Sequence, residues 1–276
     1  MKISITGSNG QLGTELVELF GYKNDLQLLS LPKHDITDDS IVQTIRSFDP
    51  DVTINCAAFT DVDACEYDNR AVDVNFLGAV NVAYACLKSH SDLVHISTDY
   101  VFDGERDGYR EDDKPNPINR YGQTKLWAEN AIKGMLFHKA YIVRTSRLYG
   151  KNGDNFVTKF LHGIENKSSV NMVRDQFGQP TYSKDLAEAI EKLIQTEKHG
   201  TYHLTNSGYC SWYGWAKEIL KLSGKDCFVN PISTQEWKRL TPIPKNSVLL
   251  NRNAFLQGIT IRPWQEALAS FMSTIT

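Results

Sequence analysis

A tyrosine and a lysine stand four residues apart in the stretch Tyr121-Gly122-Gln123-Thr124-Lys125. On a helix this spacing places both side chains on one face. A nearby cation stabilises a phenolate and so lowers the pKa of a phenol, which is about 10 in an unperturbed tyrosine. The pair therefore predicts a phenol that can donate a proton, although a tyrosine and a lysine on one solvated helix face give the same pattern.

Small hydroxylated residues come shortly before this pair. The apolar run from Leu93 to Ile96 ends at Ser97 and Thr98, as a buried parallel strand does when it delivers polar groups to a cleft. A hydroxyl from this strand can hydrogen-bond the same substrate oxygen as Tyr121. The expected catalytic set is Thr98, Tyr121 and Lys125, a proton donor for a carbonyl that is being reduced.

A strand, a glycine turn and a helix follow one another without a gap at the start of the chain. Residues 2–6 are the expected strand and residues 14–20 the expected helix, and Gly7, Gly10 and Gly13 between them have the spacing G-x-x-G-x-x-G. Such glycines permit a tight turn, a close approach to a pyrophosphate and packing of the helix on the strand. Glycine triplets also occur in ordinary loops, but their position after an N-terminal strand favours a dinucleotide site.

The end of the second expected strand, residues 26–31, bears on the choice of cofactor. Dinucleotide-binding folds commonly place an acidic residue there to bind the adenine ribose, but this chain has Pro32 and Lys33. Since a carboxylate would repel a 2′-phosphate, its absence favours NADPH, with NADH kept as the alternative. Lys33 can equally be an ordinary surface lysine.

The alternation of strands and helices predicts an α/β fold, a Rossmann-like doubly wound parallel sheet. Residues 1–150 are the expected dinucleotide-binding domain. Residues 151–276 are expected to form a smaller α/β substrate domain, with some segments returning to the first. A polar loop at residues 103–119 predicts a lid or binding loop. The further expected strands are 51–55, 93–96, 140–144, 170–173, 201–204 and 228–229, and the further helices are 70–89, 121–133, 155–165, 184–196, 211–222 and 263–273.

Composition argues against several classes of protein. With a formal net charge of -3 and no cluster of Lys or Arg, the chain has no positive electrostatic field that would attract nucleic acid. The five cysteines have no C-x-x-C spacing and indicate reduced thiols. No apolar run approaches the length of a membrane span, and the first strand begins at residue 2, where a signal peptide would otherwise stand. We therefore expect a cytoplasmic protein that binds a small molecule, with no membrane or nucleic-acid partner.

Several motifs together resemble those of the dTDP-4-dehydrorhamnose reductases, which are extended short-chain dehydrogenases/reductases. The glycine motif is shared across that superfamily, whereas S-T-D-Y-V-F-D-G and D-Q-F-G are much more specific to this branch. In chain order the matching segments are Thr6–Gly13, Ser97–Gly104, Tyr121–Lys125, Arg144–Ser146 and Asp175–Gly178. The resemblance covers nearly the whole chain.

This resemblance implies NAD(P)H-dependent reduction of the C4 keto group of dTDP-4-dehydro-L-rhamnose to dTDP-L-rhamnose. Tyr121 would donate the proton, Thr98 would bond the reacting oxygen, and Lys125 would hold the nicotinamide ribose and lower the pKa of Tyr121. The resemblance implies that Thr98 and Asp99 bind substrate, and Arg147 joins this expected set because it follows the strand that ends at Arg144. The glycine turn, the small residues after the third strand and the resemblance together give a cofactor-binding set of Gly7, Gly10, Gln11, Leu12, Gly13, Asp35, Ile36, Ala57, Ala58, Thr60, Tyr121 and Lys125.

The chain departs from that family in two places. The family usually has T-S-W where this chain has Thr145-Ser146-Arg147, and it usually has an acidic residue near Pro32. We expect Arg147 to point into the cleft and to bond a sugar hydroxyl, a diphosphate oxygen or Asp99, unless it is a surface arginine that faces solvent. The segment Lys245-Asn246-Ser247 resembles a common R-P-x-x-S segment and would complete the nucleotide-sugar site.

Other functions stay open at this point. The fold also serves non-catalytic nucleotide-binding regulatory subunits, and another nucleotide-sugar 4-keto reductase, an epimerase or a dehydratase would share the glycine turn and the Y-x-x-x-K pair. No metal-ligand set is predicted. A Mg²⁺ requirement, to which Glu15 would contribute, and a homodimer both stay undecided by the sequence.

Overall fold

The central feature of the computed structural model, which describes residues 1–275, is a parallel sheet of six strands. Its order is β10-β5-β4-β3-β1-β2, and every neighbouring pair runs parallel. The strands are β1 (Lys2–Thr6), β2 (Asp25–Leu29), β3 (Val52–Asn55), β4 (Asp92–Thr98), β5 (Ala140–Thr145) and β10 (Gly200–His203). The predicted α/β class with a doubly wound parallel sheet is confirmed.

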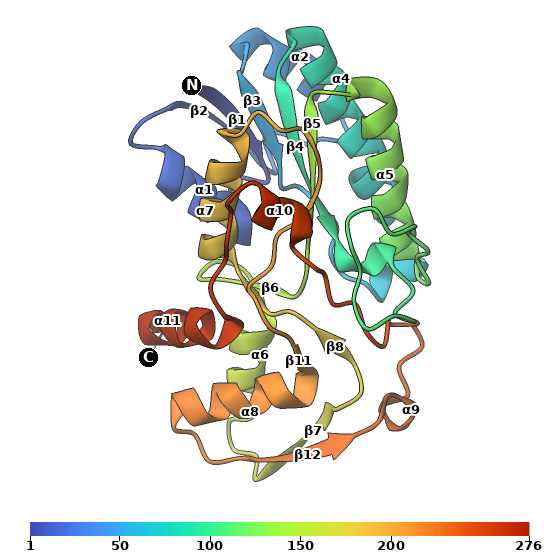
Figure 1. Cartoon of the computed structure of the whole chain (residues 1–276), viewed down its shortest axis with the longest axis vertical. Helices are drawn as coiled ribbons and strands as arrows, with labels where there is room; N and C mark the ends of the chain where they lie inside the picture. Colours follow the sequence, from blue (N-terminus) through green and yellow to red (C-terminus); the bar gives the residue numbers. More distant parts are fainter. Residues whose placement is uncertain (276) are drawn as a thin grey trace.

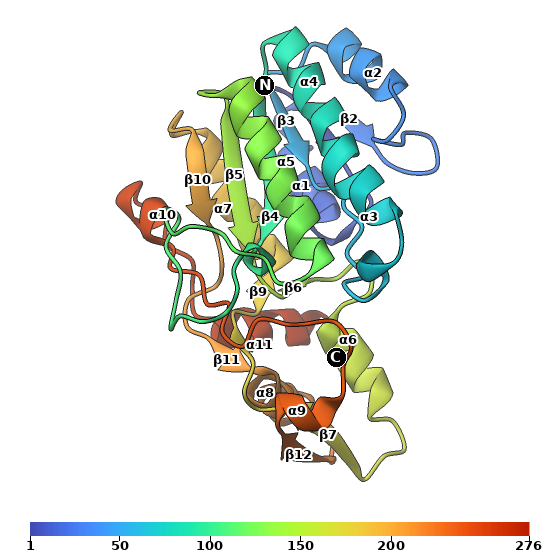
Figure 2. The same ribbon diagram turned by 90° about the vertical axis from the view of Figure 1, so that its right-hand side faces the viewer.

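Helices cover both faces of this sheet (Figures 1 and 2). The apolar sides of α1 (Gln11–Phe20) and α7 (Ser183–Ile194) pack on one face against side chains such as Ile5 and Val143. On the other face lie α2 (Ser40–Phe48), α4 (Ala79–Ser89) and α5 (Arg120–Leu136), packed against Leu93 and Ile142. Because both faces of the central strands are covered, their polar residues are buried as well, among them Ser4 on β1 and Thr53 on β3.

The order of the strands places a crevice where the direction of winding changes. The chain passes from β1 to β2 on one side and then returns to β3 on the other side of β1. At such a point the connections that leave the carboxyl ends of β1 and β3 diverge, which opens a crevice for a ligand. The glycine turn follows β1, and the segment Cys56–Thr60 follows β3.

The later part of the chain forms a second layer below the carboxyl ends of the strands (Figure 1). Its core contains buried aromatic side chains, among them Tyr149, Tyr182, Trp215 and Phe271. Its helices are α6 (Phe156–Gly163), α8 (Trp212–Ser223), α9 (Thr234–Trp237) and α11 (Trp264–Ile275), whereas α10 (Arg252–Leu256) packs beside β10 of the main sheet. Its strands are β6 (Leu148–Tyr149), β7 (Ser169–Val173), β8 (Phe177–Gly178), β9 (Thr181–Tyr182), β11 (Cys210–Ser211) and β12 (Phe228–Ile232).

Segments from residues 151–276 do return to the main sheet. Strand β10 is its edge strand and pairs with β5, and α7 packs beside α1. The division of the chain near residue 150 into a dinucleotide-binding and a substrate domain stays a prediction. The last residue of that second range, Thr276, lies outside the described residues.

Some elements differ from the sequence-based expectation. Helix α1 begins at Gln11, three residues early, because the second half of the glycine motif is itself the first helical turn. The helix expected at 70–89 is α3 (Arg70–Val72), a π-helix (Asp73–Gly78) and α4 in succession. Short 3₁₀ turns at Ala64–Glu66 and Asp99–Val101, the two-residue strands, α9 and α10 were not expected, since such short elements carry no periodicity.

Among residues 1–275, no helix is long and apolar enough to cross a membrane.

Candidate active site

The glycine turn leaves no space for side chains at two of its positions. Gly7 has φ +63°, a left-handed conformation, and a Cβ there would lie 2.8 Å from the amide nitrogen of Ala57. A Cβ at Gly13 would lie 2.1 Å from the carbonyl oxygen of Gly7, so only glycine lets α1 start this close to β1. The turn thus presents bare backbone and a helix N-terminus to the crevice between β1 and β3, which suits a pyrophosphate.

Other members of the expected cofactor set surround this turn. Gln11 donates a hydrogen bond to the carbonyl oxygen of Asp154 at 3.1 Å, and its buried Oε1 has no protein partner. Ala57 touches Gly7, whereas Leu12 is part of the core beneath α1. A glycine cradle with an unpaired buried amide oxygen beside it fits a dinucleotide that brings its own hydrogen-bond donors.

The first carboxylate after β2 in the chain, that of Asp35, is held in a local turn. Asp35 Oδ1 accepts hydrogen bonds from the backbone and the hydroxyl of Thr37, both at 2.8 Å. Ile36 is buried against Gly78 of the neighbouring helix, and Asn81 donates to the Ile36 carbonyl at 3.0 Å. Lys33 is exposed. Of the charged residues here, the lysine is thus free to meet a ligand, and the aspartate is already engaged.

The structure brings the three expected catalytic side chains to one edge of the sheet. Thr98 ends β4, and Tyr121 and Lys125 lie on the first turns of α5. The Thr98 hydroxyl is near enough to Tyr121 to oppose the rise in the pKa of its phenol. The N-terminus of α5 is fixed by Asn119, whose side chain accepts from the amide of Gly122 at 2.8 Å. A carbonyl oxygen placed at this edge would find the Tyr121 phenol as a proton donor.

Burial, rather than Lys125, has the largest effect on the phenol. It raises the pKa of Tyr121 above its ordinary value; the Thr98 hydrogen bond opposes this shift, and the Asp99 carboxylate adds to it. An effect of Lys125 on the pKa of Tyr121 stays a prediction. The ammonium of Lys125 does act on Cys56 and His95, where it lowers the pKa of both groups. Tyr121 is consequently a protonated phenol at neutral pH, the form that a proton donor needs.

Asp99 lies at the centre of a set of hydroxyl groups. Its carboxylate accepts hydrogen bonds from Thr98 at 3.1 Å, from Ser146 at 2.9 Å and from Ser247. The predicted arrival of the segment 245–247 at this site is thus observed. Burial raises the pKa of Asp99, and these hydroxyls oppose the shift. Sequence reasoning did not single out Ser146, which stands directly before Arg147.

Asn75 is a further residue that sequence reasoning missed. It lies in the π-helix, and its side-chain oxygen accepts from the Phe59 amide at 2.8 Å while its nitrogen donates to the Phe59 carbonyl at 2.9 Å. The same nitrogen lies 3.4 Å from the hydroxyl of Thr124, next to Lys125. Asn75 therefore ties the loop after β3 to the catalytic helix. The extra residue of a π-bulge was the signal, but it is visible only in the backbone.

Arg147 is located at the joint between the two layers. Its guanidinium donates to the carbonyl oxygens of Cys210 at 2.9 Å and Gln176 at 3.0 Å, and it stacks on Trp212 at 4.2 Å from the ring centroid. The alternative of a solvent-facing arginine is therefore wrong. Gly178 makes this position accessible, because a Cβ there would lie 2.8 Å from Arg147 Nε. A substrate contact by Arg147 stays a prediction.

Titratable groups do not gather into a metal site in the part of the chain that the structure describes. No group of three or more His, Cys, Asp or Glu side chains within residues 1–275 is placed to hold an ion. Glu15 is buried beside the Ser183 hydroxyl at 3.4 Å, and burial raises its pKa. A role of Glu15 in binding Mg²⁺ stays a prediction.

Comparison with known proteins finds a family that spans the whole chain. Residues 1–276 match the model of the RmlD substrate binding domain. The chain is 40% identical to the spore coat polysaccharide biosynthesis protein SpsK of Bacillus subtilis, over 98% of this chain and 96% of that protein. It is 38% identical to a dTDP-4-dehydrorhamnose reductase of Aggregatibacter actinomycetemcomitans, over 97% of each chain.

A solved structure with the same fold contains a cofactor. The crystal structure of the dTDP-4-dehydrorhamnose reductase of Bacillus anthracis in complex with NADP superposes with a TM-score of 0.95 at 40% identity, covering 99% of each chain. The similarity extends over both layers, so the glycine turn and the catalytic edge stand in the same overall framework in the two proteins.

Proposed function

This chain belongs to the RmlD substrate-binding domain family, and we propose that it uses NADPH to reduce the C4 keto group of dTDP-4-dehydro-L-rhamnose to dTDP-L-rhamnose. The observation that carries the proposal is that Thr98, Tyr121 and Lys125 come together at one edge of the sheet whose first strand ends in the glycine turn. Reduction of a ketone needs a hydride for the carbon and a proton for the oxygen. Tyr121 at this edge would supply the proton.

The bound nicotinamide would supply the hydride, and the protein residues would manage the proton. Thr98 and Tyr121 would hydrogen-bond the substrate oxygen, and the O–H bond of Tyr121 would break as charge develops on that oxygen. Burial keeps the phenol protonated until that moment. The cationic form of Lys125, one helical turn further along α5, would stabilise the resulting phenolate and hold the cofactor ribose until the phenol is reprotonated.

Cofactor binding of the NAD(P)H type is supported by the cradle of Gly7, Gly10 and Gly13. The preference for NADPH over NADH is the finer proposal. It rests on Lys33, which is exposed after β2, and on Asp35, whose carboxylate is engaged by Thr37. A 2′-phosphate would therefore find a cation within reach at this end of the crevice.

The substrate residues of the proposal are Thr98, Asp99 and Arg147. Asp99 would orient the sugar through the hydroxyl groups that surround it, since a buried carboxylate that accepts several hydrogen bonds is a fixed acceptor. Arg147 would act from the joint between the layers, where N–H groups that the Gln176 and Cys210 carbonyls leave unused can reach a ligand.

Two alternatives keep a place beside this proposal. Another nucleotide-sugar 4-keto reductase or an epimerase would use the same hydroxyl pair, so the sugar itself must be tested. A non-catalytic regulatory subunit would have no need of a paired phenol and threonine hydroxyl at the sheet edge, and this disfavours it. A cytoplasmic location and a homodimer complete the proposal.

The direct test is to mix the protein with dTDP-4-dehydro-L-rhamnose and NADPH and to follow NADPH absorbance. We expect one NADPH to be consumed per sugar, with dTDP-L-rhamnose as the product identified by NMR. A matched reaction with a UDP-hexose that lacks a keto group should consume no NADPH. Slow turnover of the keto sugar together with rapid turnover of another 4-keto nucleotide sugar would contradict the proposed substrate.

A further inference from the structure

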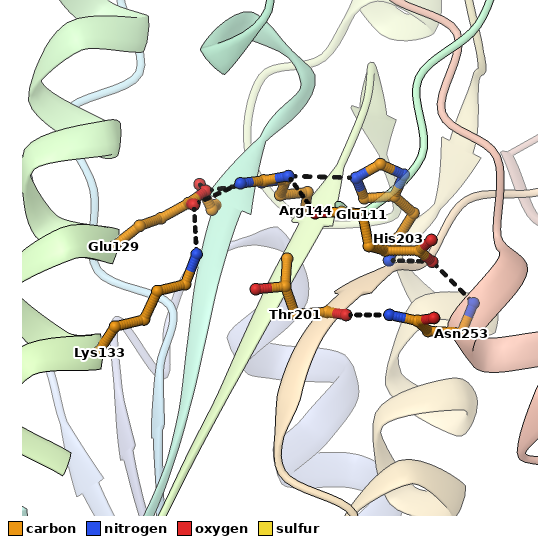
Figure 3. Close-up of polar contacts among 8 residues, drawn as sticks. Glu111, Glu129, Lys133, Arg144, Thr201, His203 and Asn253 are labelled. Carbon is orange, nitrogen blue, oxygen red and sulfur yellow. Dashed lines mark hydrogen bonds and ion pairs between the residues drawn. The ribbon is translucent and has the colours of Figure 1, made fainter. Parts of the chain in front are cut away.

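A buried ion pair lies behind the catalytic edge (Figure 3). Glu129 on α5 and Arg144 on β5 have side chains that are 0% and 1% exposed. The guanidinium holds both carboxylate oxygens, with Nε to Oε1 at 2.9 Å and Nη2 to Oε2 at 2.7 Å. Burying two charges costs free energy unless their geometry and remaining hydrogen bonds are complete, so a pair this complete needs a reason.

The carboxylate of Glu129 adjoins neighbours of both catalytic groups. Ser97, which directly precedes Thr98, donates its hydroxyl to Glu129 Oε1 at 2.6 Å. Lys125 stands one helical turn before Glu129 on the same face of α5. Glu129 therefore contacts the strand that carries Thr98 and lies one helical turn from Lys125.

The arginine extends these contacts to the polar loop 103–119. Arg144 Nη1 donates to the backbone oxygen of Glu111, in the middle of that loop, at 3.4 Å. The Glu111 carboxylate in turn accepts from the amides of His203 at 3.3 Å and Asn253 at 3.0 Å. This loop leads from the 3₁₀ turn after Thr98 to the N-terminus of α5, so the ion pair also contacts the connection between the two catalytic elements. The predicted lid is thus pinned to the sheet.

We propose that Glu129, held by Arg144 and Ser97, is a positioning residue that keeps the Lys125 ammonium charged and fixed beside Tyr121. The proposal rests on the proposed function for the role of Lys125, whereas its electrostatic part rests on the burial of both side chains and on their spacing of one turn along α5. A carboxylate one turn away along the helix attracts an ammonium strongly where water is absent. Its own arginine partner prevents it from taking up a proton.

The other groups that face Lys125 carry no charge at neutral pH. Burial raises the pKa of Cys56, after β3, to about 12. Burial also lowers the pKa of His95, on β4, well below its ordinary value. For Lys125 itself, burial lowers the pKa to about 8, and the Glu129 carboxylate opposes that shift. Loss of the carboxylate must therefore move the lysine to a still lower pKa, and the ammonium would lose its proton at a lower pH.

The test is the titration of Lys125 in the protein without ligands, followed by NMR of ¹³C-labelled lysine side chains. The variant Glu129→Gln keeps the shape of the side chain and removes its charge. We expect its titration midpoint to lie about one pH unit below that of the wild type, on the scale of a nearby charge pair. A midpoint that does not move, or that rises, would overturn the proposal.

Kinetics give a second readout that packing alone would not move. At pH 8 the turnover number of Glu129→Gln should fall about fivefold, because a Lys125 with its pKa one unit lower is about one-tenth charged there. The alkaline limb of the pH profile should shift to lower pH by the same amount, with the KM for the sugar within about twofold. An unshifted limb would contradict the proposal even if turnover is lower.

Two variants frame this experiment. Asp185→Asn removes the charge of a second carboxylate that holds an arginine through two bonds, to Arg262, and should leave the midpoint of Lys125 unchanged. Lys133→Met removes a partly exposed cation 3.4 Å from Glu129 and should raise the midpoint by a few tenths of a pH unit. If Glu129→Gln does not fold, Lys133→Met decides, and a midpoint that is unchanged or lower rejects the proposal. Because this titration needs no substrate, it can succeed even where the proposed reduction fails.

Discussion

The turn after β1 and the edge formed by β4, β5 and α5 both border the cleft, but backbone atoms form the first and side chains form the second. The turn consists of backbone atoms, and its requirement is that Gly7 and Gly13 have no side chain. The edge consists of side chains, with Thr98 hydrogen-bonded to Asp99 and with Tyr121 beside them. The first region can bind a phosphate whatever the neighbouring side chains are, whereas the second depends on each functional group.

This difference predicts which property each region controls. Changes in the turn should alter the dissociation constant of the cofactor and the free energy of unfolding, since they displace backbone. Changes at the edge should alter turnover, since the hydroxyls act as charge develops on the substrate oxygen. Four variants or comparisons test this separation.

The largest effect should come from Tyr121→Phe, which removes the proton donor and keeps the ring that packs edge-on against Tyr100. Turnover should fall by about 10²-fold or more, the range typical of lost acid catalysis. The dissociation constant of NADPH, measured by fluorescence titration, should barely change. Near wild-type turnover with the chemical step rate-limiting would remove Tyr121 from the assigned role.

A smaller effect, with the opposite signature, is expected for Gly13→Ala. The helix gains about 1 kcal/mol of propensity from alanine, but a Cβ 2.1 Å from the Gly7 oxygen forces the backbone apart. Such overpacking typically costs about 1–3 kcal/mol, so we expect net destabilisation and cofactor affinity that is roughly 5- to 100-fold weaker. Calorimetry and titration measure both quantities. Turnover at saturating NADPH should stay within about threefold of the wild type, and a selective loss of turnover would contradict the separation.

Arg147→Ala should affect the sugar rather than the cofactor. The guanidinium holds Gln176 and Cys210 of the second layer in place, and charge-assisted hydrogen bonds of this kind contribute about 1.5–3 kcal/mol. We expect kcat/KM for the nucleotide sugar to fall about tenfold or more, with cofactor affinity unchanged. Arg147→Lys, which keeps the charge but not the planar fork, should recover only part of the loss. Intact sugar kinetics for Arg147→Ala would place the residue outside substrate recognition.

The smallest effect concerns the 2′-phosphate. We expect NADPH to be used at least as well as NADH, because Lys33 is exposed after β2 and Asp35 is engaged by Thr37. Steady-state kinetics with both cofactors measure the ratio. A tenfold or greater preference for NADH in kcat/KM, about 1.4 kcal/mol, would show that groups other than Lys33 and Asp35 determine the cofactor preference.

The same difference in construction explains how far the sequence alone could predict the molecule. Apolar runs such as Leu93–Ile96 and the spacing of Gly7, Gly10 and Gly13 are local signals, and they led directly to the sheet and the turn. The roles of Glu129, Ser146 and Asn75 could not be predicted in this way, because their partners lie on other strands or loops. Glu129 and Arg144 are 15 residues apart in the chain, and no local pattern joins them.

Arg147 shows the limit most plainly. The sequence identified it as a departure from the related family, and its expected position in the cleft stays a prediction. The direction of its side chain depends on Gly178 and on the carbonyl groups of Gln176 and Cys210, which lie at β8 and β11, later in the chain. The burial that raises the pKa of Tyr121 was also beyond reach at that stage, because burial cannot be deduced from the spacing of two residues.

The most direct test of the central claim is to follow deuterium from the cofactor into the product. NADPH that carries deuterium in its transferable position should yield dTDP-L-rhamnose with deuterium bound to C4, as seen by NMR and mass spectrometry. The proton on the O4 oxygen should come from solvent through Tyr121, and Tyr121→Phe should form this labelled product at least about 10²-fold more slowly. A product without deuterium at C4, or no net oxidation of NADPH, would contradict the reductase account and favour an epimerase or a protein that only binds nucleotides.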